Sequence, residues 1–329
     1  MKAIILAGGR GTRLASVTGG SIPKPMAPVA GKSVLEYLLL TLRENGFTEL
    51  CLALRTLPET ITDYFGSGER FGVHLSYRIE AVPRGTAGAL TECRDFVGDE
   101  PFLVCSGDAL LDSDLTPLLQ LQRSTGAAAV LGLWEQAEPL SFGLCLTDRL
   151  GRVRAFVEKP AWGQVVTDLV NTGIYVFSPR VFSFIPGEGA YDIGGELLPA
   201  LLDAGEPLYA RKLNGYWRDI GEPESYYQAN LDVLSGRLPR FAPPAPVPAE
   251  PPRRRYPCAV TVKSRDCARL MRSLSALFME SGADFTDGLD VPGLHIAPRC
   301  AGELQVEAGD APTAERYAQL CRELEETGE

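Results

Sequence analysis

Short apolar runs alternate with amphipathic stretches through residues 2–177, and this alternation constrains the fold more than any other feature of the chain. Strands separated by helices pair into a mostly parallel sheet covered on both faces, so the pattern predicts an α/β domain. The expected strands span residues 2–6, 50–54, 73–78, 102–105, 128–133 and 173–177. The expected helices span residues 34–45, 59–65, 87–96 and 115–124. Ligands of such sheets bind beyond the carboxyl ends of the strands.

A glycine-rich loop follows the first expected strand. Gly8, Gly9 and Gly11 have no side chains, so their backbone N–H groups can converge on a close anionic ligand. Arg13 adds a planar, permanently charged fork, and Lys24, between two prolines, adds a mobile point charge. A bare backbone with two cations predicts a triphosphate site.

Two better-known nucleotide loops are excluded by spacing. The loop lacks the G-x-G-x-x-G order of dinucleotide-binding proteins. The tripeptide at 31–33 ends like a Walker A loop, but no glycine stands five residues before it. An ordinary glycine turn between a strand and a helix remains the alternative for the glycines alone.

Composition limits the class of protein. The net charge of −10 argues against a nucleic-acid partner, so the cations of the loop are local features for a small anionic ligand. No run approaches about 18 apolar residues, which argues against a membrane span. None of the eight cysteines forms a C-x-x-C pair, and Cys51, Cys105 and Cys145 lie in apolar runs typical of core positions. We therefore expect a cytoplasmic protein.

The composition changes abruptly at residue 239. Residues 239–257 contain eight prolines and a short arginine run, which predicts a stiff, extended linker. Residues 258–329 then read as strand, helix, two strands and helix, with the strands near 258–262, 294–296 and 304–306 and the helices at 267–281 and from 313. The pattern predicts a domain of residues 1–238, a linker, and a small C-terminal α+β domain.

Two aspartates are candidate metal ligands. Asp108 follows an apolar strand, and Asp219 ends the segment Tyr-Trp-Arg-Asp within residues 215–221. Mg²⁺ takes one or two protein carboxylates and fills its other positions with phosphate oxygens and waters. Either aspartate, taken alone, could equally be a loop or helix-capping residue.

Three further segments carry polar groups at turns. Glu158 and Lys159 precede a proline, which alone is typical of a solvated turn, and Asn171 could be a turn residue before its strand. Gly85-Thr86-Ala87-Gly88 opens an expected helix, and Thr86 alone would be read as its N-cap. The two histidines, His74 and His295, are expected to be packing or surface residues.

Together these motifs resemble, in their order, those of the sugar nucleotidyltransferases (NDP-sugar pyrophosphorylases), over residues 1–238. The resemblance implies a Rossmann-like, doubly wound mixed sheet and transfer of a nucleotidyl group from an NTP to a sugar 1-phosphate. Gly-Thr-Ala-Gly and the segments around residues 105–110, 158–164 and 170–175 are most similar to the mannose-1-phosphate guanylyltransferases, which implies GTP and mannose 1-phosphate.

The resemblance also implies residue roles. Those implied for catalysis are Arg13 and Lys24. Those implied for the nucleotide are Leu6, Ala7, Gly8, Gly9, Gly11, Thr12, Arg13, Gly85, Thr86 and Ala87. Those implied for the sugar phosphate are Gly143, Glu158, Lys159 and Asn171. Asp108 and Asp219 would hold Mg²⁺ between them.

The chain departs from the family pattern in two places. Residues 15–18 read Ala-Ser-Val-Thr where Arg-Pro-Leu-Thr is usual, which removes one phosphate cation. Arg84 replaces the usual leucine before Gly-Thr-Ala-Gly, which puts the nucleotide pocket in doubt.

The tail resembles the C-terminal domain of phosphohexomutases. Its segment 297–303 lacks the serine and threonine of that family's phosphate loop, and the other mutase domains are absent from this sequence. We expect no mutase activity from the tail, and a docking, dimerisation or regulatory role.

Three other functions stay open. The same chemistry could act on glucose or heptose 1-phosphate. A catalytically silent subunit could sense sugar nucleotides, although a pure sensor needs no complete set of cations and carboxylates. A structural partner could act through the tail, as one subunit of a homo-oligomer.

Overall fold

The structure is a computed structural model that describes residues 1–9, 11–241, 258–263, 295–300 and 303–308. The chain divides into two compact units, each described by itself. Unit 1 holds the described residues of Met1–Arg10, Pro23–Pro25 and Tyr37–Trp217, and unit 2 those of Gly11–Ile22, Met26–Glu36 and Arg218–Glu329. The proposed linker at 239–257 falls mainly outside the described residues, so the three-part division stays a prediction.

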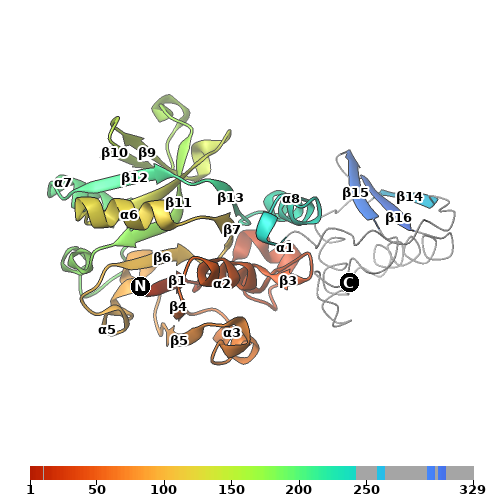
Figure 1. Ribbon diagram of the computed structural model, residues 1–329, viewed down its shortest axis with the longest axis horizontal. Helices are drawn as coiled ribbons and strands as arrows, with labels where there is room; N and C mark the ends of the chain where they lie inside the picture. The colour runs from red at the N-terminus through yellow and green to blue at the C-terminus, as the bar shows by residue number, and fades with distance from the viewer. Residues whose placement is uncertain (10, 242–257, 264–294, 301–302, 309–329) are drawn as a thin grey trace. The chain divides into compact units, whose positions relative to one another are not determined.

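Unit 1 is built on a nine-stranded mixed sheet (Figure 1). Its strands are β1 (Ala3–Leu6), β4 (Glu49–Leu54), β5 (His74–Ile79), β6 (Phe102–Ser106), β8 (Ala129–Glu135), β9 (Gly143–Thr147), β10 (Val153–Glu158), β11 (Leu169–Phe177) and β12 (Leu208–Lys212). The main order is β10-β9-β11-β6-β1-β4-β5, and β8 joins β11 to β12. All six strands expected in this region are present, within a few residues of the expected bounds.

The sheet is mixed rather than mostly parallel. β1 runs parallel to both β4 and β6, and β4 runs parallel to β5. β11 runs antiparallel to β6, β8 and β9, and β9 runs antiparallel to β10. β1, β4 and β6 are mainly apolar runs, as is typical of parallel strands covered on both faces, whereas β5 at the end of the strand order mixes polar and apolar residues. The parallel strands bring the loops after β1, β4, β5 and β6 to one edge of the sheet.

Helices cover the sheet, mostly where the sequence predicts them. They include α2 (Val34–Glu44), α3 (Pro58–Phe65), α6 (Thr116–Thr125) and α7 (Leu198–Asp203). The helix expected at 87–96 is instead two helices, α4 (Gly85–Thr91) and α5 (Arg94–Val97). The chain tightens between them, since the N–H of Cys93 donates to the carbonyl of Leu90 at 3.0 Å. No described helix is long and apolar enough to span a membrane.

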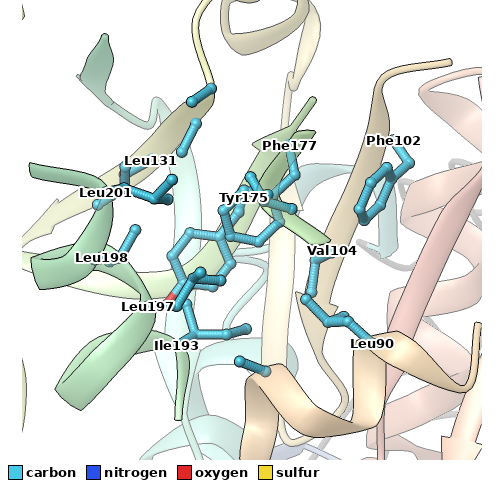
Figure 2. Packing of buried hydrophobic residues seen from close by; sticks show 14 of the residues in the cluster. Leu90, Phe102, Val104, Leu131, Tyr175, Phe177, Ile193, Leu197, Leu198 and Leu201 are labelled. Carbon is cyan, nitrogen blue, oxygen red and sulfur yellow. The ribbon is translucent and has the colours of Figure 1, made fainter. Parts of the chain in front are cut away.

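The core of unit 1 lies between the sheet, α4 and α7 (Figure 2). Phe102 of β6 stacks on Phe182 with ring centroids 5.5 Å apart, and Tyr175 stacks on Phe177 of β11 at 5.1 Å. Leu90 of α4 is fully buried in the same cluster. This packing fixes β6, β11 and α4 relative to one another, and these elements carry the loops of the candidate site. Cys51, Cys105 and Cys145 are buried, as expected, and His74 is exposed.

A short strand pair is separate from the nine-stranded sheet. β7 (Ala109–Ser113) pairs with β13 (Gly215–Asp219). Gly215 has a φ of 108°, and a Cβ there would lie 3.2 Å from the Cα of Ser113, so the close approach of the two strands requires glycine.

Unit 2 contains α8 (Pro223–Leu234) and the hairpin of β2 (Pro28–Val29) and β3 (Lys32–Ser33). Ala30, in the turn of the hairpin, has a φ of 45°, and its N–H donates to Oδ1 of Asn230 at 3.0 Å. The Nδ2 of Asn230 donates to the carbonyl of Tyr226 at 3.0 Å. A buried amide on α8 therefore holds the hairpin turn in a conformation that is costly for alanine.

The tail contributes a three-stranded antiparallel sheet of order β14-β16-β15, with β14 (Cys258–Lys263), β15 (His295–Cys300) and β16 (Glu303–Ala308). The three strands expected in the tail are thus present. The two helices expected there lie outside the described residues. The likeness to a phosphohexomutase domain stays a prediction, with residues 297–300 of the compared segment on β15.

Candidate active site

The carboxyl ends of four parallel strands border a cavity of about 270 Å³ in unit 1. Gly8 and Gly9 follow β1, Arg55 follows β4, Glu80 follows β5, and Asp108 follows β6. Polar side chains therefore ring the cavity at the edge where ligands of open α/β sheets bind. Leu6, Ala53 and Ala89 give it an apolar wall.

Asp108 and Lys24 form an ion pair at this cavity. The Nζ of Lys24 lies 2.6 Å from Oδ2 of Asp108, and the hydroxyl of Ser106 donates to Oδ1 at 2.6 Å. Burial of Asp108 opposes its ionisation, but the Lys24 charge and the two hydrogen bonds outweigh it and lower the pKa of Asp108. The carboxylate is therefore ionised at neutral pH, beside a lysine that is almost fully buried.

The glycine loop approaches its neighbours closely at one position. A Cβ on Gly8 would lie 3.3 Å from Oε2 of Glu80 and 3.4 Å from Cβ of Arg55, whereas Gly9 has open space around it. Gly9 thus leaves the backbone exposed to a ligand. Ala7, also expected at the nucleotide, is buried, and its N–H donates to the carbonyl of Ala53 at 2.9 Å.

The start of α4 forms another part of the cavity. Gly85 has a φ of 73°, and a Cβ there would lie 2.7 Å from the carbonyl oxygen of Tyr191, so only glycine fits. Thr86 is not the N-cap, because α4 begins one residue before it. Instead the N–H and hydroxyl of Thr86 donate to Oδ1 of Asp192 at 3.0 and 3.1 Å. Ala87 is buried, and its N–H donates to Tyr191.

Sequence reasoning missed three charged residues of this cavity: Arg55, Glu80 and Asp192. Arg55 and Glu80 come directly after β4 and β5, so the carboxyl-end rule applied to every expected strand would have found them. No such signal points to Asp192, because it does not follow one of these strands. It precedes the π-helical turn Ile193–Leu197.

Glu80 has a buried acceptor. Its Oε1 is buried with no hydrogen-bond partner among the described residues. Burial raises the pKa of Glu80, and the nearby Arg55 partly offsets the rise. Glu80 lines the cavity, and a carboxylate there is suited to a ligand that carries N–H or O–H donors.

Arg84, the departure from the family pattern, does not line this cavity. Its Nη1 pairs with Oε1 of Glu92 at 2.8 Å, and its Nη2 donates to the carbonyl of Gly187 at 2.6 Å. The side chain thus connects α4 to the segment before Asp192, and its charge acts on Glu80 of the cavity, so an effect of Arg84 on the nucleotide pocket stays a prediction.

The residues expected at the sugar gather where β9, β10 and β11 meet. Gly143 and Glu158 are register partners, and a Cβ on Gly143 would lie 2.7 Å from Oε2 of Glu158. The Nδ2 of Asn171 donates to the hydroxyl of Tyr175 at 2.6 Å. Burial raises the pKa of Glu158, the Lys159 charge opposes the rise, and Asp192 adds to it. The backbone of Lys159 has a φ of 45°, and its side chain is exposed, as in a turn.

Arg13 and Asp219 belong to unit 2. The Nη1 of Arg13 lies 2.9 Å from Oε1 of Glu222. A Cβ on Gly221 would lie 2.6 Å from Oδ2 of Asp219 and 3.3 Å from Nη2 of Arg13, so glycine allows these charged groups to gather.

Two more expected nucleotide residues also lie in unit 2. Gly11, with a φ of 61°, precedes the 3₁₀ turn Thr12–Leu14 that carries Arg13. Asp108 lies in unit 1 and Asp219 in unit 2, so their joint coordination of one ion stays a prediction.

The described side chains fit Mg²⁺ only if the ion takes most of its ligands from phosphates and water. Among the described residues, no group of three or more His, Cys, Asp and Glu side chains could hold a metal. Asp108 supplies one ionised carboxylate at a cavity with room for phosphates. That donor set suits an ion whose remaining ligands are phosphate oxygens and waters.

Comparison with known proteins agrees with this geometry. The profile of the family described as Nucleotidyl transferase matches residues 2–236. The UTP–glucose-1-phosphate uridylyltransferase of Synechocystis sp. is 41% identical over 251 residues, which are 72% of this chain and 64% of the relative. The mannose-1-phosphate guanylyltransferase of Mycobacterium tuberculosis is 35% identical over 238 residues, 72% of this chain and 66% of the relative.

The matches thus span slightly less than two thirds of these relatives' lengths. Among solved structures, HddC from Yersinia pseudotuberculosis, complexed with GMP-PN, superposes with a TM-score of 0.60 at 28% identity, over 70% of this chain and 97% of that one. Sugar nucleotidyltransferases are generally Mg²⁺-dependent. The mixed α/β sheet, the cavity at its edge and these matches agree, and the chain belongs to the nucleotidyl transferase family.

Proposed function

We propose that residues 1–238 transfer a nucleotidyl group from an NTP to a sugar 1-phosphate and release pyrophosphate. One observation carries the proposal: the bare backbone at Gly8 and Gly9 borders the same cavity as Asp108, which pairs with Lys24, at the carboxyl edge of the sheet. The family membership supports this reaction class.

The chemistry requires positioning more than proton transfer. A phosphate oxygen of the sugar 1-phosphate attacks the α-phosphorus in line, the new P–O bond forms, and the bond to pyrophosphate breaks. A phosphate monoester is already ionised near neutral pH, so no histidine or serine base is needed. Lys24 binds the α-phosphate or the sugar phosphate, and Arg13 and the loop amides stabilise the leaving pyrophosphate. Mg²⁺ held by Asp108, with Asp219 as its expected second ligand, would neutralise phosphate charge.

Glu80 favours GTP as the nucleotide. A carboxylate only accepts hydrogen bonds, and guanine presents two adjacent donors, its N1–H and N2–H₂. Uracil and thymine present one N–H between two carbonyls, which would repel a carboxylate. Because Glu80 lines the cavity, its carboxylate supports guanine. The guanylyltransferase of M. tuberculosis and the neighbour complexed with GMP-PN also support GTP as the nucleotide.

Mannose 1-phosphate is the sugar substrate that we propose, with Gly143, Glu158, Lys159 and Asn171 as its contacts. The cluster at β9, β10 and β11 offers acceptors and an amide for sugar hydroxyls. The 41% identical relative named as a uridylyltransferase supports the second candidate, UTP with glucose 1-phosphate.

A matrix of the four NTPs against mannose, glucose and heptose 1-phosphates, assayed for pyrophosphate with Mg²⁺, tests the function. We expect the fastest release from GTP and mannose 1-phosphate in the wild type. Asp108→Ala should lose about a hundredfold in rate, as is common when one preorganised group of such a site is removed. Asp95→Ala is the control, because it also breaks an aspartate pair, with Arg78 at the surface, outside the cavity.

Near-normal turnover of Asp108→Ala would refute the site. Tight binding of GTP and mannose 1-phosphate without pyrophosphate release would favour a sensing subunit instead.

A further inference from the structure

Both oxygens of Asp108 are already engaged. The Ser106 hydroxyl donates to Oδ1, and the Lys24 ammonium lies on Oδ2, each at 2.6 Å. The Lys24 side chain is only 9% exposed, whereas 33% of the Asp108 side chain is exposed to the cavity. A second cation that approaches Asp108 from the cavity therefore meets a carboxylate whose charge is already balanced from the protein side.

We propose that Lys24 is a placeholder cation, which occupies Asp108 and keeps a divalent ion off this carboxylate until a triphosphate enters the cavity. The inference rests on the proposed function, since it takes a triphosphate as the incoming anion. Two cations on one carboxylate oxygen would repel each other at about 3–4 Å, and in a partly buried site this repulsion is weakly screened. Lys24 and a divalent ion thus compete for Asp108.

The rest of the cavity does not compensate for this competition. The Oδ1 of Asp192 accepts two hydrogen bonds from Thr86, and Glu80 has a raised pKa because of its burial. No cluster of metal-binding side chains exists elsewhere among the described residues. Three carboxylates thus line the described cavity, and each is constrained: Asp108 is paired with Lys24, Asp192 accepts from Thr86, and burial disfavours the ionised form of Glu80.

Lysine suits a placeholder better than arginine. Its ammonium is a compact charge on a flexible stem, so it can leave one oxygen anion for another without breaking a bidentate fork. Lys24 lies between Pro23 and Pro25, at the start of the 3₁₀ turn Lys24–Met26. The prolines restrict the backbone, so the ammonium of Lys24 moves by rotation of its side chain. A triphosphate would draw the ammonium away from Asp108 and supply the oxygens that a divalent ion needs.

Titration of the full chain with Mn²⁺, which stands in for Mg²⁺ and is read by electron paramagnetic resonance, tests the placeholder without nucleotide and without turnover. We expect weak binding to the wild type and an affinity higher by about tenfold or more in Lys24→Met, because the competing charge is gone. Adding Asp108→Asn to Lys24→Met should remove the gain. Lys212→Met is the matched control, since it frees the carboxylate of Glu135 from a lysine outside the cavity and should change nothing.

The placeholder is overturned if the wild type binds Mn²⁺ as tightly as Lys24→Met, or if a folded Lys24→Met shows no gain. Should the methionine variant fail to fold, as judged by circular dichroism, Lys24→Gln replaces it. The pyrophosphate assay on the wild type separates the two proposals: a gain of Mn²⁺ affinity without any turnover supports the placeholder and contradicts the enzyme, and turnover without the gain does the reverse.

Discussion

At the scale of single residues, the site depends on how each carboxylate is solvated. Asp108 is held ionised by Lys24 and Ser106, whereas Glu80 keeps a buried oxygen without a described partner. The sequence pointed to Asp108 because of the motif around it. It did not point to Glu80, because burial and an absent partner are properties of the folded chain.

Glu80→Gln should change both nucleotide choice and pH-dependent stability. The pKa of Glu80 is raised by burial, so its ionised form destabilises the fold at neutral pH, and the penalty fades as the pH falls through the raised pKa. We expect a higher Tm than wild type near pH 8, and a difference that shrinks toward pH 5. An amide both donates and accepts, so kcat/KM should shift from GTP toward UTP.

Thermal melts at several pH values and competition between GTP and UTP measure the two effects. The exposed Glu100→Gln serves as the control and should change neither. Unchanged nucleotide preference in a folded Glu80→Gln would remove Glu80 from base recognition.

At the scale of elements, β1, β4, β5, β6, β8 and β11 were predictable from the sequence, whereas β9, β10 and β12 were not. β1, β4 and β6 are mainly apolar runs with both faces covered, and such runs can be recognised in the sequence. β10 reads Val-Arg-Ala-Phe-Val-Glu, in which polar and apolar residues mix, so it resembled a loop. β9 was missed in the same region. The break between α4 and α5 depends on tertiary packing around Cys93, which no local pattern encodes.

The start of α4 can be tested with two glycines that have a similar positive φ. Gly85 has a φ of 73° and would clash with Tyr191 if it carried a Cβ, whereas Gly126, the C-cap of α6, has a φ of 59° and nothing within 4 Å. Gly126→Ala should cost about 1–2 kcal/mol of unfolding free energy, the cost of a left-handed alanine. Gly85→Ala should cost at least about 1 kcal/mol more, because the backbone of Tyr191 must move.

Urea denaturation of both variants gives this difference directly. Equal losses of unfolding free energy would show that the backbone of Tyr191 moves at little cost. The contact would then not fix the position of the first residues of α4.

At the scale of the whole molecule, every candidate site residue precedes residue 239. The sequence predicted this division from the proline-rich stretch, and the described residues of the tail add only a three-stranded sheet. Composition predicts that a domain ends at residue 238, and this boundary stays a prediction. Composition could not indicate how the chain groups in space, because segments 11–22 and 26–36 belong to the same unit as the C-terminal part.

Deletion of residues 239–329 should leave pyrophosphate release within about twofold of the full chain, because a domain with its own core and site does not need an appended one. Sedimentation of both forms reports self-association in parallel. Unchanged activity with loss of an oligomer would assign the tail to assembly, and loss of activity in a folded 1–238 chain would contradict the expected independence of the domain.

Asp192 lies where it could couple the binding of the two proposed substrates. Its carboxylate accepts from Thr86 at the cavity, and its charge raises the pKa of Glu158 in the cluster of β9, β10 and β11. A ligand that neutralises or reorients Asp192 on one side therefore alters the proton affinity of Glu158 on the other. Thermodynamic reciprocity then requires that protonation or engagement of Glu158 change the affinity of the first ligand by the same factor. One carboxylate thus couples the cavity to the cluster of β9, β10 and β11.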